Sequence, residues 1–109
     1  MAELDEERPA EMVIEKRSDP SGGPVVAVSG ELDISNAATL EATVAAVAAE
    51  RPERLSFDLS GLRYMDSAGI AVLLGAATKL KEVHIRDPSP AVRRVIEITG
   101  LTDVLSVEP

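Results

Sequence analysis

The chain has 109 residues, a formal net charge of −8 at pH 7, no cysteine, and aromatic side chains at only 2% of its positions. This length predicts a single domain. The negative charge and the scarce aromatic residues argue against nucleic acid or an anionic membrane as a partner, because both attract cationic surfaces. No apolar run reaches about 18 residues and no signal peptide opens the chain. We therefore expect a cytoplasmic protein without disulfides or thiolate metal sites.

The first part of the chain predicts a tail followed by a β-hairpin. Residues 1–11 are rich in acidic side chains and are expected to form a flexible tail, so that the domain runs over residues 12–109. Residues 12–14 begin a short strand, which we place at the edge of a sheet. The segment 19–24 is dense in turn-forming residues. Residues 25–29 should therefore return as an antiparallel strand after a long hairpin loop whose tip is expected to be mobile.

A helix and a central strand follow the hairpin. Ser35 or Asn36 can cap the helix, and Pro52 stops it. Apolar and polar residues then alternate over residues 55–60, which predicts a half-buried strand. Gly61 is expected to end this strand.

Asp66 and Ser67 open a second helix, which is predicted to run from residue 67 to between residues 78 and 80. The Asp66 carboxylate is suited to cap it, because it can accept from free N–H groups of the first turn. A phosphate on the Ser67 hydroxyl would lie at the positive end of the helix dipole, so the fold could tolerate about −1.5 to −2 added charges there. A partner packed against this point could not, which predicts a switch. In the simpler alternative, the two residues merely start a helix.

The last part of the chain predicts a strand over residues 82–87 and a helix that begins at Ser89 and Pro90 and ends at Gly100. A final half-turn and a short strand are expected after it. The resulting order, β-β-α-β-α-β-α, implies right-handed crossovers. It predicts an α/β domain with a mixed sheet of four to five strands.

No motif in the sequence indicates catalysis or the binding of a cofactor. The chain has no GxxxxGK[ST] or GxGxxG loop, and its only histidine, His84, lies in the middle of a strand, where an exposed strand position is the simpler interpretation. Asp33, Asp58 and Asp66 could cluster at the carboxyl ends of neighbouring strands and bind a divalent cation. Capping and loop roles are favoured for each of them. We therefore expect no enzymatic activity, no cofactor and no metal site.

Three segments resemble STAS domains and, more narrowly, the bacterial anti-sigma factor antagonists. They are GELDISNAATLEAT at residues 30–43, DLSGLRYMDSAGIAVLL at residues 58–74 and SPAVRRVIEITGL at residues 89–101, within a similarity that covers residues 12–107. The resemblance implies a STAS-like mixed sheet with helices mainly on one side. It also implies a partner, an anti-sigma factor that is an ATP-dependent serine kinase and whose capture frees a sigma factor.

The resemblance further implies roles for individual residues. The kinase would phosphorylate Ser67, the phosphorylated chain would release the kinase, and a phosphatase would reset the switch. Asp66 would shape the loop that carries the phosphate, and Asp33 would lie in the contact surface beside it. Gly30 and Gly69 would permit close approach of the backbone. The partner-binding residues implied by the match are Asp33, Asp66, Gly69, Glu31, Ser35 and Asn36.

The sequence departs from the family pattern at two places. Residue 68 is alanine where a hydroxyl is frequent, and residues 77–81 lead almost directly into the next strand, which predicts a truncated or tightly turned second helix. Two other functions stay open. One is a scaffold or subunit of a lipid-transport or stress-sensor complex in which Ser67 is never modified. The other is a STAS domain that binds a small ligand.

Overall fold

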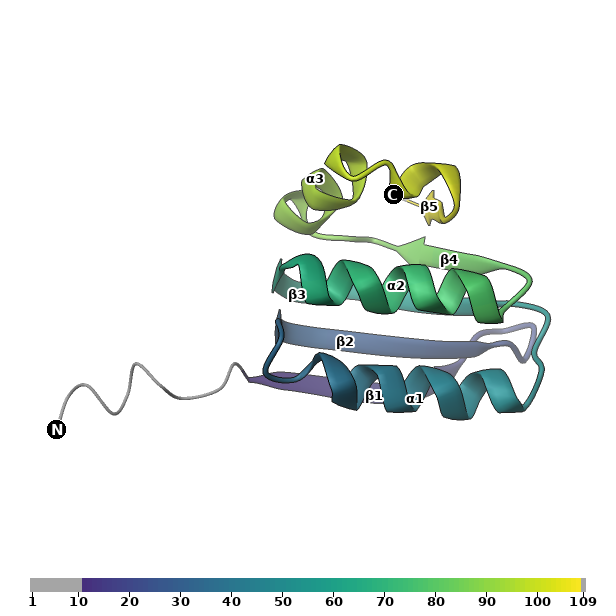
Figure 1. Ribbon diagram of the computed structural model, residues 1–109. Helices are drawn as coiled ribbons and strands as arrows, with labels where there is room; N and C mark the ends of the chain where they lie inside the picture. The colour runs from purple at the N-terminus through teal and green to yellow at the C-terminus, as the bar shows by residue number, and fades with distance from the viewer. Residues whose placement is uncertain (1–10, 109) are drawn as a thin grey trace, which may run out of the picture.

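The computed structural model describes residues 11–108, which fold into a sheet with two helices lying across one of its faces (Figure 1). The strands are β1 (Met12–Ser18), β2 (Pro24–Leu32), β3 (Leu55–Met65), β4 (Val83–Arg86) and β5 (Ser106–Glu108). The helices are α1 (Ala37–Ala49), α2 (Ser67–Lys79), α3 (Pro90–Ile98) and the 3-10 helix η2 (Leu101–Asp103). The tail predicted for residues 1–11 lies outside the described residues except for Glu11.

The five strands lie side by side in the order in which they occur along the chain, β1-β2-β3-β4-β5. β1 is antiparallel to β2, and every other neighbouring pair is parallel. This arrangement confirms the mixed sheet and the opening hairpin predicted from the sequence. It also places the carboxyl ends of β2 and β3 at the same end of the sheet, which is called the Ser67 edge below because Ser67 follows β3. The functional loops of α/β folds usually lie at this end of the strands.

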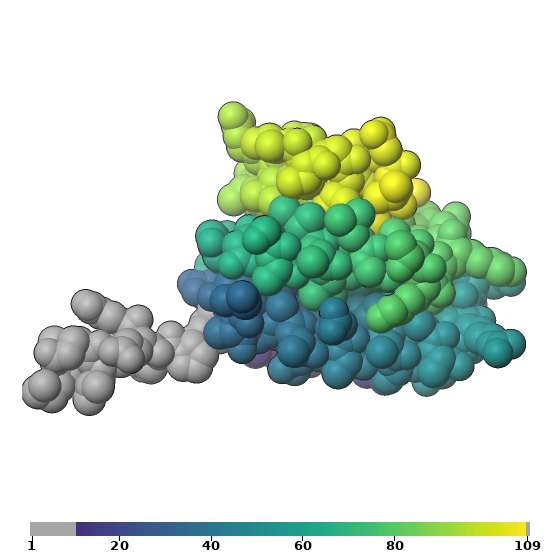
Figure 2. Space-filling view, in the orientation of Figure 1, coloured from purple at the N-terminus to yellow at the C-terminus, as the bar shows by residue number. Residues whose placement is uncertain are grey.

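The core lies between the sheet and the pair α1 and α2, which pack against each other over this face (Figure 2). Burial of one large aliphatic or aromatic side chain contributes roughly 1.5–3 kcal/mol, so this layer supplies most of the driving force for folding. The apolar positions of the predicted central strand are all buried, as the alternation indicated. The large side chains that are fully buried are Phe57, Leu32, Leu40, Leu55, Leu59, Leu62, Leu73, Ile85, Ile96, Val26, Val28 and Val44.

β3 is longer than predicted, because Gly61 does not end it. The strand continues to Met65, and Gly61 lies where the register between β2 and β3 shifts, opposite Ser29. A Cβ atom at Gly61 would lie 2.8 Å from the Cβ of Ser29. The missing side chain lets the two strands approach closely at this irregularity. β3 therefore reaches the same edge as Leu32, the last residue of β2.

β1 is also longer than the short strand predicted at residues 12–14, although its edge position is confirmed. It extends to Ser18, and each of its residues faces a residue of β2 in an unbroken register. The added residues include Glu15 and Arg17, which are exposed. Charged side chains on an edge strand oppose pairing with other chains, so the extension does not create an open edge for aggregation.

The last third of the chain follows the prediction closely. Ser89 caps α3, since its hydroxyl accepts from the backbone N–H of Val92 at 3.4 Å, and Pro90 occupies the first helical position. Gly100 follows the helix with a φ of 77°, the left-handed conformation that favours glycine after a helix. η2 and β5 are the predicted half-turn and short strand. Within residues 11–108, no helix has the length and apolar character needed to cross a membrane.

Candidate functional site

Ser67 is the first residue of α2, and its side chain is exposed. Asp66 is the N-cap: its carboxylate accepts from the backbone N–H of Ala68 at 2.9 Å, and its carbonyl accepts from Ile70 at 3.1 Å. This confirms the predicted start of the helix. α2 ends at Lys79, and only residues 80–82 join it to β4, which confirms the predicted tight turn. The hydroxyl of Ser67 is therefore held on a rigid helix start at the edge where β3 ends.

The loop between β2 and α1 is built by the side chains of Asp33 and Asn36. The Asp33 carboxylate accepts from the backbone N–H of Ser35 at 2.8 Å and from its hydroxyl at 2.6 Å. Asn36 occupies the N-cap position of α1, but its side-chain amide forms hydrogen bonds with residues that precede it in the chain. Its Oδ1 accepts from the Asp33 N–H at 3.0 Å, and its Nδ2 donates to the Glu31 carbonyl at 2.9 Å. Asn36 thus occupies the predicted N-cap position, but its side chain makes no capping hydrogen bond to the helix and shapes the loop instead.

The two loops are fastened to each other. Leu32 and Met65 face each other in the parallel register of β2 and β3, and the backbone N–H of Asp66 donates to the Leu32 carbonyl at 3.3 Å. Gly69 completes this junction from inside α2. A Cβ atom there would lie 2.4 Å from Cγ of Met65 and 2.8 Å from Cδ2 of Leu32. Gly69 is therefore buried packing that brings the helix onto the strands, and it offers no side chain to a partner.

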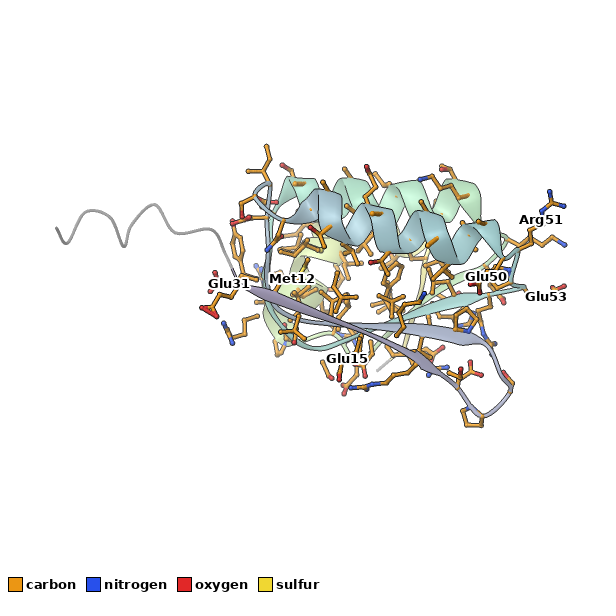
Figure 3. The ribbon with its side chains drawn as sticks, turned by 90° about the horizontal axis from the view of Figure 1, so that it is seen from below. Met12, Glu15, Glu31, Glu50, Arg51 and Glu53 are labelled. Atoms are coloured by element: carbon orange, nitrogen blue, oxygen red, sulfur yellow. The ribbon has the colours of Figure 1, made fainter. Side chains whose placement is uncertain are left out.

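Gly30 and Glu31 extend the same edge towards the start of β1. Gly30 has a φ of 94°, and a Cβ atom there would lie 2.3 Å from the carbonyl oxygen of Glu11. The Glu31 N–H donates to that carbonyl at 2.9 Å, and the Glu31 carboxylate lies 3.7 Å from the Arg63 guanidinium. Figure 3 shows Glu31 and Met12 together at one end of the domain and Glu50, Arg51 and Glu53 at the other. Glu31 therefore belongs to the same edge as Ser67.

Asp58 and His84 lie away from this edge. The Asp58 carboxylate accepts from the Ser60 N–H at 3.0 Å and lies 3.7 Å from Arg17, in the middle of the sheet. It does not join Asp33 and Asp66, and no cluster of three potential metal ligands exists among residues 11–108. His84 is half-buried rather than exposed, with Nδ1 2.7 Å from the Glu108 carboxylate. Its role is to connect β4 with β5.

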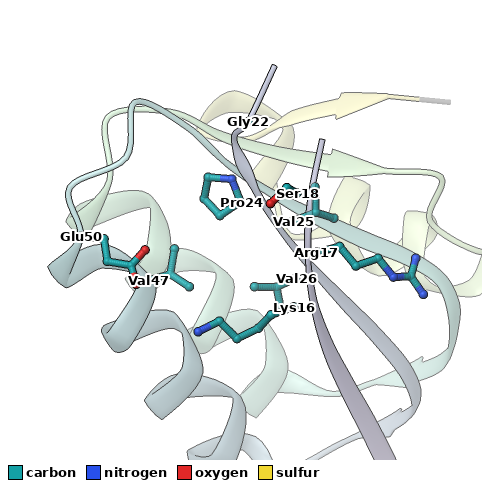
Figure 4. A pocket seen from close by; sticks show the side chains of 9 residues that line it. All are labelled: Lys16, Arg17, Ser18, Gly22, Pro24, Val25, Val26, Val47 and Glu50. Carbon is teal, nitrogen blue, oxygen red and sulfur yellow. The ribbon is translucent and has the colours of Figure 1, made fainter. Parts of the chain in front are cut away.

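A pocket of about 300 Å³ lies at the opposite end of the domain from Ser67 (Figure 4). The hairpin of β1 and β2 forms one wall, with Lys16 and Val26, and the end of α1 forms the other, with Val47 and Glu50. The pocket is separate from the edge that carries Ser67.

One exposed side chain at the Ser67 edge was not singled out from the sequence. Ile34, between Asp33 and Ser35, is 85% exposed. The sequence signal was an isoleucine in an otherwise polar segment, at a position that does not belong to the apolar stripe of the following helix.

Comparison with known proteins shows which family of proteins this chain is similar to. A model of the family described as "Mlab, STAS domain" matches residues 16–107. An anti-sigma-B factor antagonist of Staphylococcus aureus is 33% identical over 86 residues, which covers 75% of this chain and 80% of that protein. The anti-sigma-F factor antagonist RsfB of Mycobacterium tuberculosis is 30% identical over 87 residues, covering 77% of this chain and 71% of that protein.

A solved structure agrees with these relatives. The crystal structure of an anti-sigma factor antagonist from Mycobacterium paratuberculosis is 33% identical and superposes with a TM-score of 0.84, covering 91% of this chain and 86% of that chain. The family model, the two relatives and this structure all match across most of the described domain. The chain therefore belongs to the STAS-domain family of anti-sigma factor antagonists.

Proposed function

We propose that this chain binds an anti-sigma factor that is also a serine kinase, that the binding frees a sigma factor, and that phosphorylation of Ser67 ends the binding. The observation that supports this most directly is the position of Ser67. Its side chain is exposed at the first position of α2, while Met65 and Gly69 on either side of it are buried. A kinase can reach the hydroxyl without disturbing the core.

The local electrostatics support a switch that acts on the interface and spares the fold. A phosphate on Ser67 adds about −1.5 to −2 charges at the positive end of the α2 dipole, where anions are stabilised. The same charge would have to lose its water when a partner packs against the site, which is costly for an ion without a partner of opposite charge. Phosphorylation should therefore weaken binding and leave folding intact.

The remaining chemistry belongs to the partners. The chain has no phosphate-binding loop, so ATP is assigned to the kinase. A phosphatase would return Ser67 to the free hydroxyl and restore binding. Because sigma factors act on the transcription machinery, we place this cycle in the cytoplasm. In this cycle the chain is a substrate and a binding protein, not an enzyme.

The test compares two forms of the chain as baits for the anti-sigma factors of the source organism, produced as purified proteins. Ser67→Ala should bind one of them whether or not ATP is present. Ser67→Glu should bind it at least about a hundredfold more weakly, since like-charge or unpaired-charge contacts cost several kcal/mol at an interface. Incubation of the unsubstituted chain with this protein and ATP should place phosphate on Ser67, as mapped by mass spectrometry.

Thr102→Glu is the matched control, because Thr102 is exposed in η2, away from the Ser67 edge. It should bind like the unsubstituted chain, and all variants should keep its melting temperature. Equal binding by Ser67→Ala and Ser67→Glu would refute the switch and favour a constitutive scaffold. A lost melting transition in Ser67→Glu would show that the charge acts on the fold instead.

A further inference from the structure

We infer that Ile34 is a hydrophobic anchor for the anti-sigma factor, and that the partner presents an apolar recess to receive it. This inference rests on the proposed function and specifies the chemistry of the surface that the partner must offer. Ile34 lies in the loop between β2 and α1 and is 85% exposed, the largest exposed fraction among the large apolar side chains of residues 11–108. Single exposed apolar residues are common in proteins, so the inference depends on three further observations.

The first observation is that the loop holds Ile34 in a fixed position. The Asp33 carboxylate accepts from both the N–H and the hydroxyl of Ser35, and the Asp33 carbonyl accepts from the N–H of Asn36 at 3.2 Å and of Ala37 at 2.9 Å. The Asn36 side chain ties the residues on the other side of Ile34, as described above. A side chain presented by a rigid loop loses little conformational entropy on binding, which favours its use as an anchor.

The second observation is the position of Ile34 beside Ser67. Leu32 and Met65 face each other in register, and neighbouring strands lie about 4.8 Å apart. Ile34 and Ser67 are each two residues beyond this pair, on loops that the hydrogen bond from Asp66 to Leu32 joins. A protein that covers the Ser67 hydroxyl will therefore meet Ile34. A phosphate on Ser67 would place its charge next to the recess that Ile34 fills.

The third observation is that Ile34 contributes little to the fold and is flanked by acidic groups. An apolar residue before a helix often packs on the first turn, but an exposed fraction of 85% excludes that role here. The first buried side chain of α1 is Leu40. The ion pairs formed among residues 11–108 do not include Asp33 or Asp66. Salt would screen any interaction of these two carboxylates with a partner, whereas it would not weaken the burial of Ile34.

The experiment measures the affinity of the purified anti-sigma factor for matched alanine variants. Ile34→Ala should weaken binding by about tenfold to a hundredfold, which corresponds to the burial of one large aliphatic side chain. Ile98→Ala is the control, because Ile98 is 74% exposed but lies at the end of α3, away from this edge. Ile98→Ala should bind like the unsubstituted chain. Ile34→Leu should recover most of the lost affinity.

The salt dependence of binding separates the contribution of Ile34 from that of the nearby carboxylates of Asp33 and Asp66. The loss caused by Ile34→Ala should persist at high salt, since salt screens charges and does not weaken apolar burial. The melting temperature of the free Ile34→Ala chain should be unchanged. If Ile34→Ala binds as tightly as the unsubstituted chain, the anchor is refuted while the proposed function stands. If no anti-sigma factor binds the unsubstituted chain, the proposed function fails and the anchor with it.

Discussion

Aspartate side chains at the two ends of the sheet differ in whether a basic residue pairs with them. At the hairpin end, the Asp19 side chain is only 2% exposed, and its carboxylate lies 3.3 Å from Arg54 and 3.4 Å from Arg86. At the Ser67 end, the carboxylates of Asp33 and Asp66 accept hydrogen bonds only from their own loops, and within residues 11–108 no arginine or lysine pairs with them. Asp19 is thus neutralised by two arginines, whereas Asp33 and Asp66 have no basic partner in this part of the chain, although Glu31 at the same edge lies 3.7 Å from Arg63.

The hairpin end owes its order to Asp19. The hydroxyl of Ser21 and the N–H of Gly23 donate to its carboxylate at 2.6 Å and 2.8 Å. These hydrogen bonds, with a contribution from Arg54, lower the pKa of Asp19 from 3.8 to about 2. In the hairpin loop predicted at residues 19–24, one buried carboxylate thus ties the turn to Arg54, just before β3, and to Arg86 of β4. We attribute to this end a role in stability.

Charges that only serve the fold are paired within the chain, because an unpaired buried charge is costly. At the edge that carries Ser67, Asp33 and Asp66 support their own loops without a basic partner among the described residues and lie on the same two loops as the exposed Ile34. We therefore expect substitution of Asp19 at the hairpin end to change stability and substitution of the exposed side chains at the Ser67 end to change binding. Asp19→Asn and Asp33→Asn test this division, and Gly69→Ala tests the packing that joins the Ser67 edge to the core.

The largest effect on stability is expected where the Ser67 edge meets the core, at Gly69→Ala. Its new Cβ would meet Met65 and Leu32 well inside contact distance. Overpacking of this kind costs about 1–3 kcal/mol of unfolding free energy, measured by denaturant titration. Gly75→Ala is the matched control in the same helix: nothing lies within 4 Å of its Cβ. It should stabilise α2 by about 0.5–1 kcal/mol. Equal effects of the two substitutions would contradict the packing role of Gly69.

Asp19→Asn should lower the melting temperature at neutral pH and leave the affinity for the anti-sigma factor unchanged. Asp19 has a pKa of about 2 in the folded chain, below its ordinary 3.8, so its charged form stabilises the fold above the ordinary value. That contribution is lost as the pH falls through about 2. The gap in melting temperature between the two chains should therefore narrow from about pH 5 downwards. A gap independent of pH would show that the charge of Asp19 is not what stabilises the hairpin end.

Asp33→Asn should change the affinity for the anti-sigma factor rather than the stability of the fold. Its effect should be the smallest of the three. The amide retains an acceptor for Ser35, so the free energy of unfolding should change by less than about 0.5 kcal/mol. Binding of the anti-sigma factor should weaken by at most about fivefold at low salt, and the loss should fade as salt screens the charge of Asp33. Isothermal titration calorimetry at two salt concentrations measures the affinity, and denaturant titration measures the free energy of unfolding. A large fall in stability would mean that Asp33 serves the loop rather than the partner.

The order of elements could be read from the sequence because local signals specify it. Asp66 before α2 and Ser89 before α3, with Pro90 at the first helical position, act on their own first turns, and the structure confirms both starts. The length of β3 could not be read in this way. Gly61 is a breaker by local preference, but here it allows a close approach to Ser29, which is a contact between strands.

The sequence by itself determined which segments form strands and helices, the start of α2 at Ser67, and the resemblance that led to the family. These follow from periodicity, capping and local motifs, which depend on residues close together in the chain. Tertiary structure alone decided that Asp58 stays apart from Asp33 and Asp66, that Asp19 is buried against two arginines, and that Ile34 is exposed beside Ser67. The physical reason is that burial, charge pairing and the meeting of two loops depend on strand register, and register is set by contacts between residues far apart in the chain.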